Sequence, residues 1–89
     1  MKAKISVVLL VVLIVGVISA AAAGGIISSA TAQKDALAAV GGGTVTLAVL
    51  ETNGGKLTWS VDITGKSHDY EVWVDAHTGG INKIITQPK

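Results

Sequence analysis

Two histidines and two aspartates in the C-terminal third of the chain are the side chains best suited to binding a metal ion. They are His68, Asp69, Asp75 and His77. A zinc site needs three or four ligands that converge on one ion, often at spacings such as H-E-x-x-H. These residues match no such pattern, and they flank a strand-like segment whose ends lie more than about 20 Å apart at 3.3 Å per residue. We therefore interpret the histidines as exposed turn residues and expect no metal or other cofactor.

The residue types favour neither nucleophilic catalysis nor nucleic-acid binding. Ser60 and Ser67 lack a plausible histidine and acid, and the chain contains no cysteine, whereas an activated nucleophile needs a base within hydrogen-bond reach. The basic residues are 7 lysines without an arginine, and they form no cluster able to neutralise a run of phosphates. We therefore expect a protein that is not an enzyme and does not bind nucleic acid.

Asp75, Thr78 and Gly79 have a structural interpretation instead. They lie at the end of a strand-like segment, where an aspartate carboxylate typically accepts backbone N–H bonds and a glycine adopts positive φ. The three residues therefore predict a structural turn motif.

The N-terminal segment predicts export or membrane anchoring. Lys2 and Lys4 precede the apolar run 5–18, and small residues with A-x-A spacing follow in 19–23, as in a signal peptide. An uncleaved transmembrane anchor is the alternative, because residues 5–27 carry no charge and are long enough to cross about 30 Å of hydrocarbon. The two lysines would then keep the N-terminus in the cytoplasm. Cleavage stays open, but either alternative places the rest of the chain outside the cytoplasm, anchored to the membrane or secreted.

The chain of 89 residues allows one domain at most. About 55 residues remain to fold once the N-terminal segment is set aside, and a domain of this size has marginal stability. Because no disulfide is available, a protein partner, a second copy in a homo-oligomer, or the membrane could supply further stabilisation instead.

These patterns predict one helix and divide the chain into four regions. A short helix is expected from Ala32 to Val40, with Thr31 as its N-cap and the glycines 41–43 as its end. The regions are a signal peptide or anchor at 1–23, a tether at 24–32, a folded domain at 33–86 and a tail at 87–89.

The rest of the domain alternates apolar and polar side chains, as half-buried strands do. The predicted strands are Thr44–Glu51, Lys56–Thr64 and His68–Ala76, with 81–86 as an optional fourth. Each has one apolar face, and the helix is the element available to cover it. The fold class is therefore α+β: one short helix packed on a three- to four-stranded antiparallel β-meander, preceded by an apolar signal or anchor helix.

Alternation also sorts the side chains between the two faces of this sheet. On the first strand it assigns Leu47 and Val49, with Val45, to the helix side. The polar-face residues that we expect to bind a partner are Trp73, Thr58, Ser60 and Glu71. A large aromatic side chain on such a face supplies much of the binding energy when a partner buries it, and a free sheet edge could alternatively add a partner strand.

The order of short motifs resembles a PepSY domain over about residues 34–84. The motifs are Asp35-Ala36-Leu37 with Ala39-Val40, Gly42-Gly43-Thr44-Val45, Trp59-Ser60-Val61, and Val74-Asp75-Ala76 with Thr78-Gly79. The last is the most specific. Gly41 stands where the family often has proline, and Trp59 where it usually has tyrosine, but both changes keep the helix end and a large core aromatic.

This resemblance implies a module that binds and restrains peptidases near the cell surface, with no catalytic residue to carry over. The expected function is a non-enzymatic, extracytoplasmic protein-binding module whose partner is a secreted or membrane peptidase. The alternative is a membrane-anchored structural or sensory ectodomain without a peptidase partner.

Overall fold

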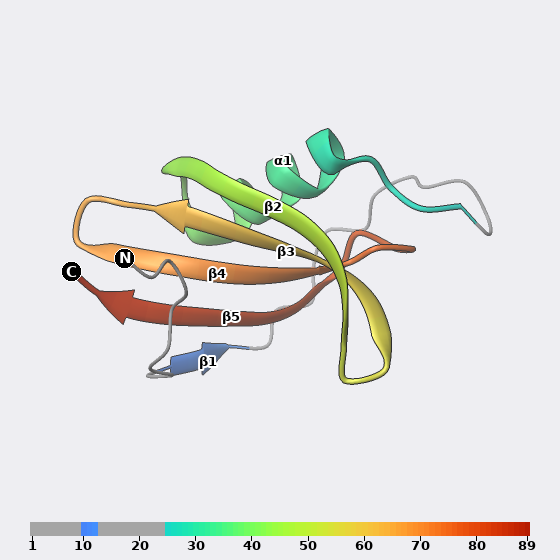
Figure 1. Ribbon diagram of the computed structural model, residues 1–89. Helices are drawn as coiled ribbons and strands as arrows, with labels where there is room; N and C mark the ends of the chain where they lie inside the picture. The colour runs from blue at the N-terminus through green and yellow to red at the C-terminus, as the bar shows by residue number, and fades with distance from the viewer. Residues whose placement is uncertain (1–9, 13–24) are drawn as a thin grey trace.

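The computed structural model describes residues 10–12 and 25–89, which form a helix and a five-stranded sheet (Figure 1). The elements are β1 (Leu10–Val12), α1 (Ser29–Val40), β2 (Thr44–Asn53), β3 (Lys56–Thr64), β4 (His68–Asp75) and β5 (Ile81–Pro88). The strands are antiparallel throughout, in the order β1-β5-β4-β3-β2. The predicted α+β fold, one short helix on a four-stranded antiparallel sheet, is confirmed for β2–β5.

The predicted signal or anchor helix falls largely outside the described residues. Of the segment 5–27, the structure describes Leu10–Val12, which pairs with β5, and residues 25–27. Within the described part of the chain, no helix combines the length and apolar character needed to span a bilayer.

Helix α1 begins earlier than the sequence predicted. The hydroxyl of Ser28 accepts a hydrogen bond from the Thr31 N–H at 3.1 Å, so Ser28 is the N-cap and the prediction of Thr31 is wrong. Both residue types are good caps, and the serine adds a turn to the helix. The helix ends as predicted at the glycines, since Gly41 has φ 85° and its N–H donates to the Leu37 carbonyl.

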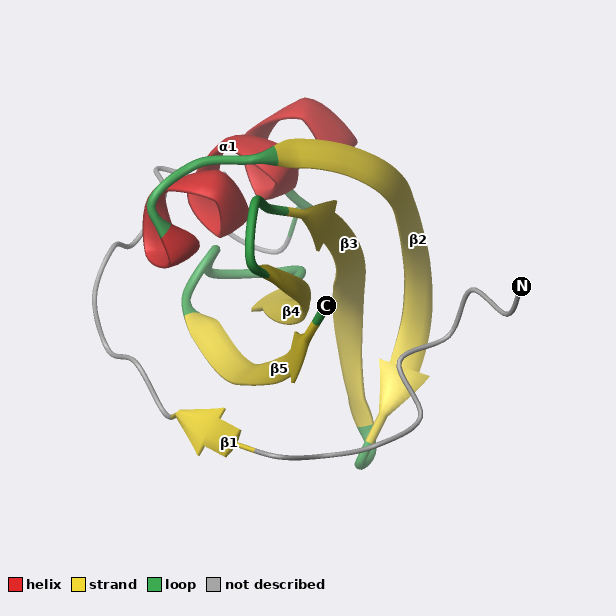
Figure 2. Ribbon diagram, turned by 90° about the vertical axis from the view of Figure 1, so that its left-hand side faces the viewer, coloured by secondary structure: helices red, strands yellow, loops and turns green. Residues whose placement is uncertain are grey.

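Small residues let α1 lie close to the sheet. Ala32 and Ala36 are fully buried, and they face Val61, Val72 and Val74, whose side chains are also fully buried. Figure 2 shows the helix lying across one side of the curved sheet. The core therefore lies between α1 and this face, while the described residues place no helix on the other face.

A β-bulge near the start of β2 reverses the faces of the residues from Leu47 onward. The register with β3 shifts between Val45 and Leu47, and one extra residue moves the following side chains to the opposite face. Leu47 and Val49 consequently lie on the face away from α1, and Ala48 takes the helix side. The prediction that Leu47 and Val49 pack beneath the helix is therefore wrong.

Residues of the predicted tether are part of the folded unit. Ile27 is buried in the core, and its N–H donates to the Ala76 carbonyl at 2.8 Å. The Trp59 indole N–H donates to the Ile27 carbonyl at 3.0 Å, and a His77 ring nitrogen lies 3.2 Å from the Gly25 carbonyl oxygen. The chain is thus attached to the sheet several residues before the helix starts. At the other end, β5 runs through Pro88 into the predicted tail.

Candidate functional site: the open face of the sheet

The face of β2–β5 opposite α1 is called the open face. Cross-strand pairs, which share a face, define its members. They are Thr44, Leu47, Val49, Glu51 and Asn53 on β2, Lys56, Thr58, Ser60, Asp62 and Thr64 on β3, Asp69, Glu71, Trp73 and Asp75 on β4, and Lys83, Ile85 and Gln87 on β5. All four predicted partner-binding residues therefore lie on one surface.

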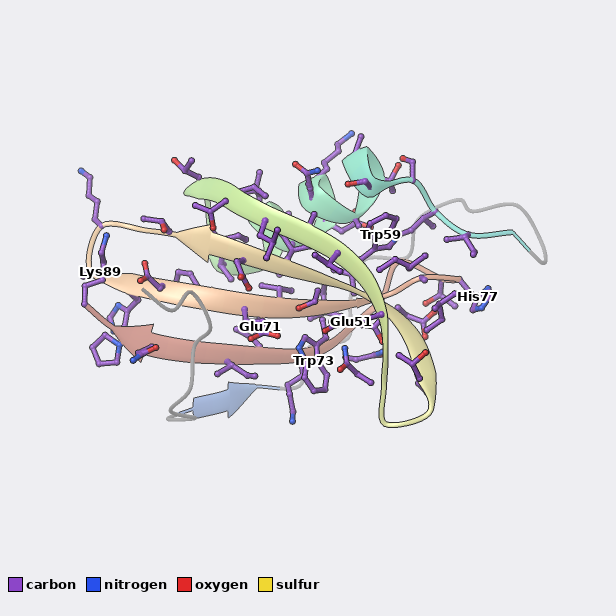
Figure 3. All side chains as sticks on the ribbon, in the orientation of Figure 1. Glu51, Trp59, Glu71, Trp73, His77 and Lys89 are labelled. Atoms are coloured by element: carbon purple, nitrogen blue, oxygen red, sulfur yellow. The ribbon has the colours of Figure 1, made fainter. Side chains whose placement is uncertain are left out.

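Three of those four residues form one hydrogen-bonded cluster, and Figure 3 shows two of them, Glu71 and Trp73, near each other. The Ser60 hydroxyl and the Trp73 indole N–H each donate to Oε2 of Glu71 at 2.9 Å. Glu71 is only 5% exposed, so these two donors compensate for part of the hydration that its carboxylate loses on burial. Thr58 is buried in the neighbouring row, where its hydroxyl donates to the Lys56 carbonyl. Of the four, Trp73 is therefore the side chain most able to contact a partner.

Lys83 completes the surroundings of Trp73 and was missed from the sequence. Its Nζ lies 4.5 Å from the centroid of the indole ring, within the range of a cation–π contact. Lys83 is opposite Trp73 because the β4–β5 register shifts between Trp73 and Val74. Simple alternation along an optional strand could not have located this shift. The indole is thus held at its edge by Glu71 and across its face by Lys83.

The open face is acidic. The chain has 6 acidic residues, and all except Asp35 belong to this face: Glu51, Asp62, Asp69, Glu71 and Asp75. Asp62 is directly opposite Glu71 in the register, and like charges in such a pair are unfavourable. The open-face residues defined above include two lysines, Lys56 and Lys83, so the acidic side chains are in excess. A negative potential over this face follows from this distribution.

The turn after β4 is built on the carboxylate of Asp75. Its Oδ1 accepts the N–H of His77 at 2.8 Å and that of Thr78 at 3.0 Å. The Thr78 hydroxyl accepts the Gly80 N–H at 3.0 Å, and Gly79 has φ 81°. The structure therefore places all three residues of the turn motif in one compact loop, with the carboxylate used by the backbone.

These contacts alter the acidity of Asp75. Partial burial acts to raise its pKa, but the two backbone N–H bonds, the positive charge of Lys56 and the Asn82 side chain together lower the pKa below the ordinary value of 3.8. Hydrogen bonds to an ionised carboxylate favour that form. Asp75 is therefore a stably ionised turn residue.

Comparison with known families gives a match over most of this structure. The family model for PepSY, described as "Peptidase propeptide and YPEB domain", matches residues 26–81. The chain belongs to the PepSY family. The match begins at the attached segment before α1 and ends as β5 starts. No curated protein and no solved structure matches the chain.

The histidines of this PepSY domain lie at opposite ends of β4. The His68 ring stacks on Tyr70 with centroids 6.2 Å apart, whereas His77 contacts the segment before α1. Over residues 10–12 and 25–89, no group of three or more histidine, aspartate or glutamate side chains is placed to hold a metal ion.

A shallow hollow of about 360 Å³ lies at the C-terminal end of α1. It is lined by Val40, the glycines 41–43, Gly65, Lys66 and Tyr70. Its lining includes no carboxylate, histidine or serine that could serve as a base or nucleophile for Lys66 or Tyr70 to assist. The open face is therefore the surface of this domain that best fits a function.

Proposed function

We propose that this PepSY domain is a non-enzymatic, extracytoplasmic module that binds another protein through the open face. A peptidase is the class of partner, because the family description names peptidase propeptides. The observation that carries the proposal is the position of Trp73. It lies on the sheet face opposite α1, where the part of the chain that the structure describes has no helix, and it contacts Glu71 and Lys83.

The restricted conformation of the Trp73 side chain favours binding. Glu71 and Lys83 restrict the indole before any partner arrives. A side chain that is already ordered loses less conformational entropy when it is buried, so more of its contact energy appears as affinity. Tryptophan is also among the residues that most often dominate binding energy at interfaces.

Apolar side chains beside Trp73 extend the contact area. Val49 is opposite Ser60, and Ser60 is opposite Trp73, so the valine and the indole lie in the same cross-strand row. Leu47 occupies the next row and is 49% exposed, while Val49 is 39% exposed. A partner that covers Trp73 can therefore also remove apolar surface of β2 from water.

The acidic side chains around Trp73, Val49 and Leu47 favour a partner with a positively charged surface. A complementary surface presents lysine or arginine side chains to Glu51 and Asp62, and it brings an apolar residue to Trp73. Such pairing increases the association rate and disfavours acidic partners. Binding should accordingly weaken as ionic strength rises.

The proposal is tested with the peptidases that the host exports. The full-length protein is immobilised, and peptidase capture and inhibition are measured for wild type, Trp73→Ala and Lys34→Ala. Lys34 is an exposed residue of α1, so its variant controls for general surface changes. Trp73→Ala should weaken binding about tenfold or more, as at an interface hot spot, and Lys34→Ala should not. Equal capture by all three proteins, or no capture of any exported peptidase, would refute the proposed function.

A further inference from the structure

Exposed apolar side chains concentrate on one strand. Among the described residues, the large hydrophobic side chains that are exposed are Ile26, Leu47, Val49 and Leu50. Three of these belong to β2, and two of the three, Val49 and Leu50, are each 39% exposed.

These side chains point to both sides of the sheet. Leu47 and Val49 lie on the open face, whereas Leu50 is opposite Trp59 and lies on the helix side. A missing covering layer would expose one face only. Exposure on both faces of a single strand instead indicates a missing neighbour alongside it. In the described sheet β2 can accept such a neighbouring strand, because it is an edge strand that pairs with β3 alone.

This edge lacks most of the features that prevent strand pairing. Natural edge strands are usually protected by charges, proline or bulges. The only charged residue of β2 is Glu51, and the strand contains no proline. Its bulge lies between Val45 and Leu47, so the protection affects the start of the strand and leaves the backbone from Leu47 onward regular.

We propose that β2 pairs antiparallel with β2 of a second copy of this chain, across Leu47–Leu50. A two-fold axis perpendicular to the sheet then brings Leu47 and Val49 of both copies together on one face and Leu50 of both copies together on the other. Isologous contacts of this kind require a self-complementary surface. The segment meets this requirement because it is apolar on both faces and carries no charge between Thr44 and Leu50.

Charge separates this arrangement from the other ways in which two copies could meet. Two open faces would oppose the same acidic side chains, such as Glu51 and Asp62, to each other, and like charges repel. The β2 edge is neutral, so the repulsion is small there. The small domain also lacks disulfides and gains buried apolar area by pairing.

Edge pairing has a consequence for the open face. Directly opposed residues of an antiparallel pair point to the same side of the sheet, so both copies present their Trp73 side chains on one side of a continuous sheet. A partner with two contact regions, or two partner molecules held together, would then bind with increased avidity.

Cysteine scanning of the full-length protein tests the proposal, because the chain has no native cysteine. Single Cys substitutions at Leu47, Ala48, Val49 and Leu50 are oxidised and followed by non-reducing electrophoresis. A disulfide forms readily when the Cα atoms lie about 4.4–6.8 Å apart, as they do near a two-fold axis between paired strands. Lys66→Cys, at the exposed β3–β4 turn, is the matched control. At least one of the four positions should give a homodimeric band about tenfold faster than the control.

A second variant shows whether the cross-link reports edge pairing. Leu47→Lys places a charge on the open-face side of β2, and combined with Val49→Cys or Leu50→Cys it should reduce cross-linking to the rate of Lys66→Cys. Circular dichroism confirms that each variant is folded. The proposal is overturned if the four positions react no faster than the control, if Leu47→Lys leaves their rate unchanged, or if the cross-linked species contains a different protein.

Discussion

The hydrogen bond from Trp59 to Ile27 is expected to hold the segment before α1 on the sheet. The perturbation is Trp59→Phe, which keeps a large aromatic ring and removes the indole N–H. The bond is 3.0 Å long and partly buried, and it joins residues 32 positions apart in the sequence. Its loss leaves the carbonyl of Ile27, a residue of the core, without this donor.

The magnitude follows from three contributions. A neutral hydrogen bond stabilises a protein by about 1 kcal/mol, and leaving the carbonyl unsatisfied can increase the loss toward about 2 kcal/mol. The smaller ring of phenylalanine adds a packing loss on the order of 1 kcal/mol. We therefore expect the free energy of unfolding to fall by about 2–3 kcal/mol. For a domain of this size, each kcal/mol corresponds to roughly 4–8 °C in Tm.

Urea unfolding followed by circular dichroism measures the loss, and amide hydrogen exchange locates it. The Ile27 N–H donates to the Ala76 carbonyl at 2.8 Å, so its exchange should accelerate by more than the global destabilisation accounts for. Trp73→Phe is the matched control, because its indole donates to Glu71 instead and should leave the relative exchange of Ile27 unchanged. A loss below about 0.5 kcal/mol, the range of ordinary surface substitutions, would refute the role given to this bond.

Three further outcomes are expected in unfolding experiments. Gly43→Ala should lower the free energy of unfolding by about 1–3 kcal/mol more than Gly42→Ala does. A Cβ at position 43 would lie 2.7 Å from Cγ2 of Ile63, whereas a Cβ at position 42 meets nothing within 4 Å. Equal losses of stability in the two variants would contradict this reasoning. Ser28→Ala should cost about 1 kcal/mol as a lost N-cap, measured by urea titration, and an unchanged midpoint would reassign the cap. The pKa of Asp75 is below 3.8, so its carboxylate stabilises the fold above about pH 4 and this stabilisation is lost as pH falls through the folded-state pKa. Asp75→Asn should therefore be less stable than wild type at pH 7, and the difference in stability should become smaller on acidification to about pH 2–3. A difference that increases on acidification would contradict this prediction.

The two proposed surfaces of this PepSY domain share Leu47 and Val49, but each has its own test. The open face contacts a partner through Trp73 and its acidic surroundings, whereas the β2 edge contacts a second copy through Leu47 to Leu50. If the single Cys variants of β2 cross-link no faster than Lys66→Cys while the wild-type protein captures a peptidase, the edge pairing alone is refuted. If the wild-type protein captures no exported peptidase while the β2 Cys variants cross-link, the proposed function alone is refuted.

Local signals were sufficient for much of the fold. The alternation of β3 and β4 and the glycines after α1 depend on residues close together in the sequence, because side-chain period and turn conformation are properties of short segments. For this reason the helix, the antiparallel meander and the strand positions were predicted. The shared face of Ser60, Glu71 and Trp73 followed from the same alternation.

The features that were wrong or missed depend on contacts between distant segments. The bulge in β2 moves Leu47 and Val49 to the open face, and the shift in β5 brings Lys83 onto Trp73. Neither register shift can be recognised from the local sequence pattern, since the register between two strands depends on the whole set of paired side chains. The attachment of Ile27 likewise requires Trp59 and Ala76 to be in place. Local sequence was therefore sufficient for the elements and for the apolar faces of β3 and β4. Which side chains share the open face, including those of β2 after its bulge, depended on the assembled sheet, because only that sheet sets the register between its strands.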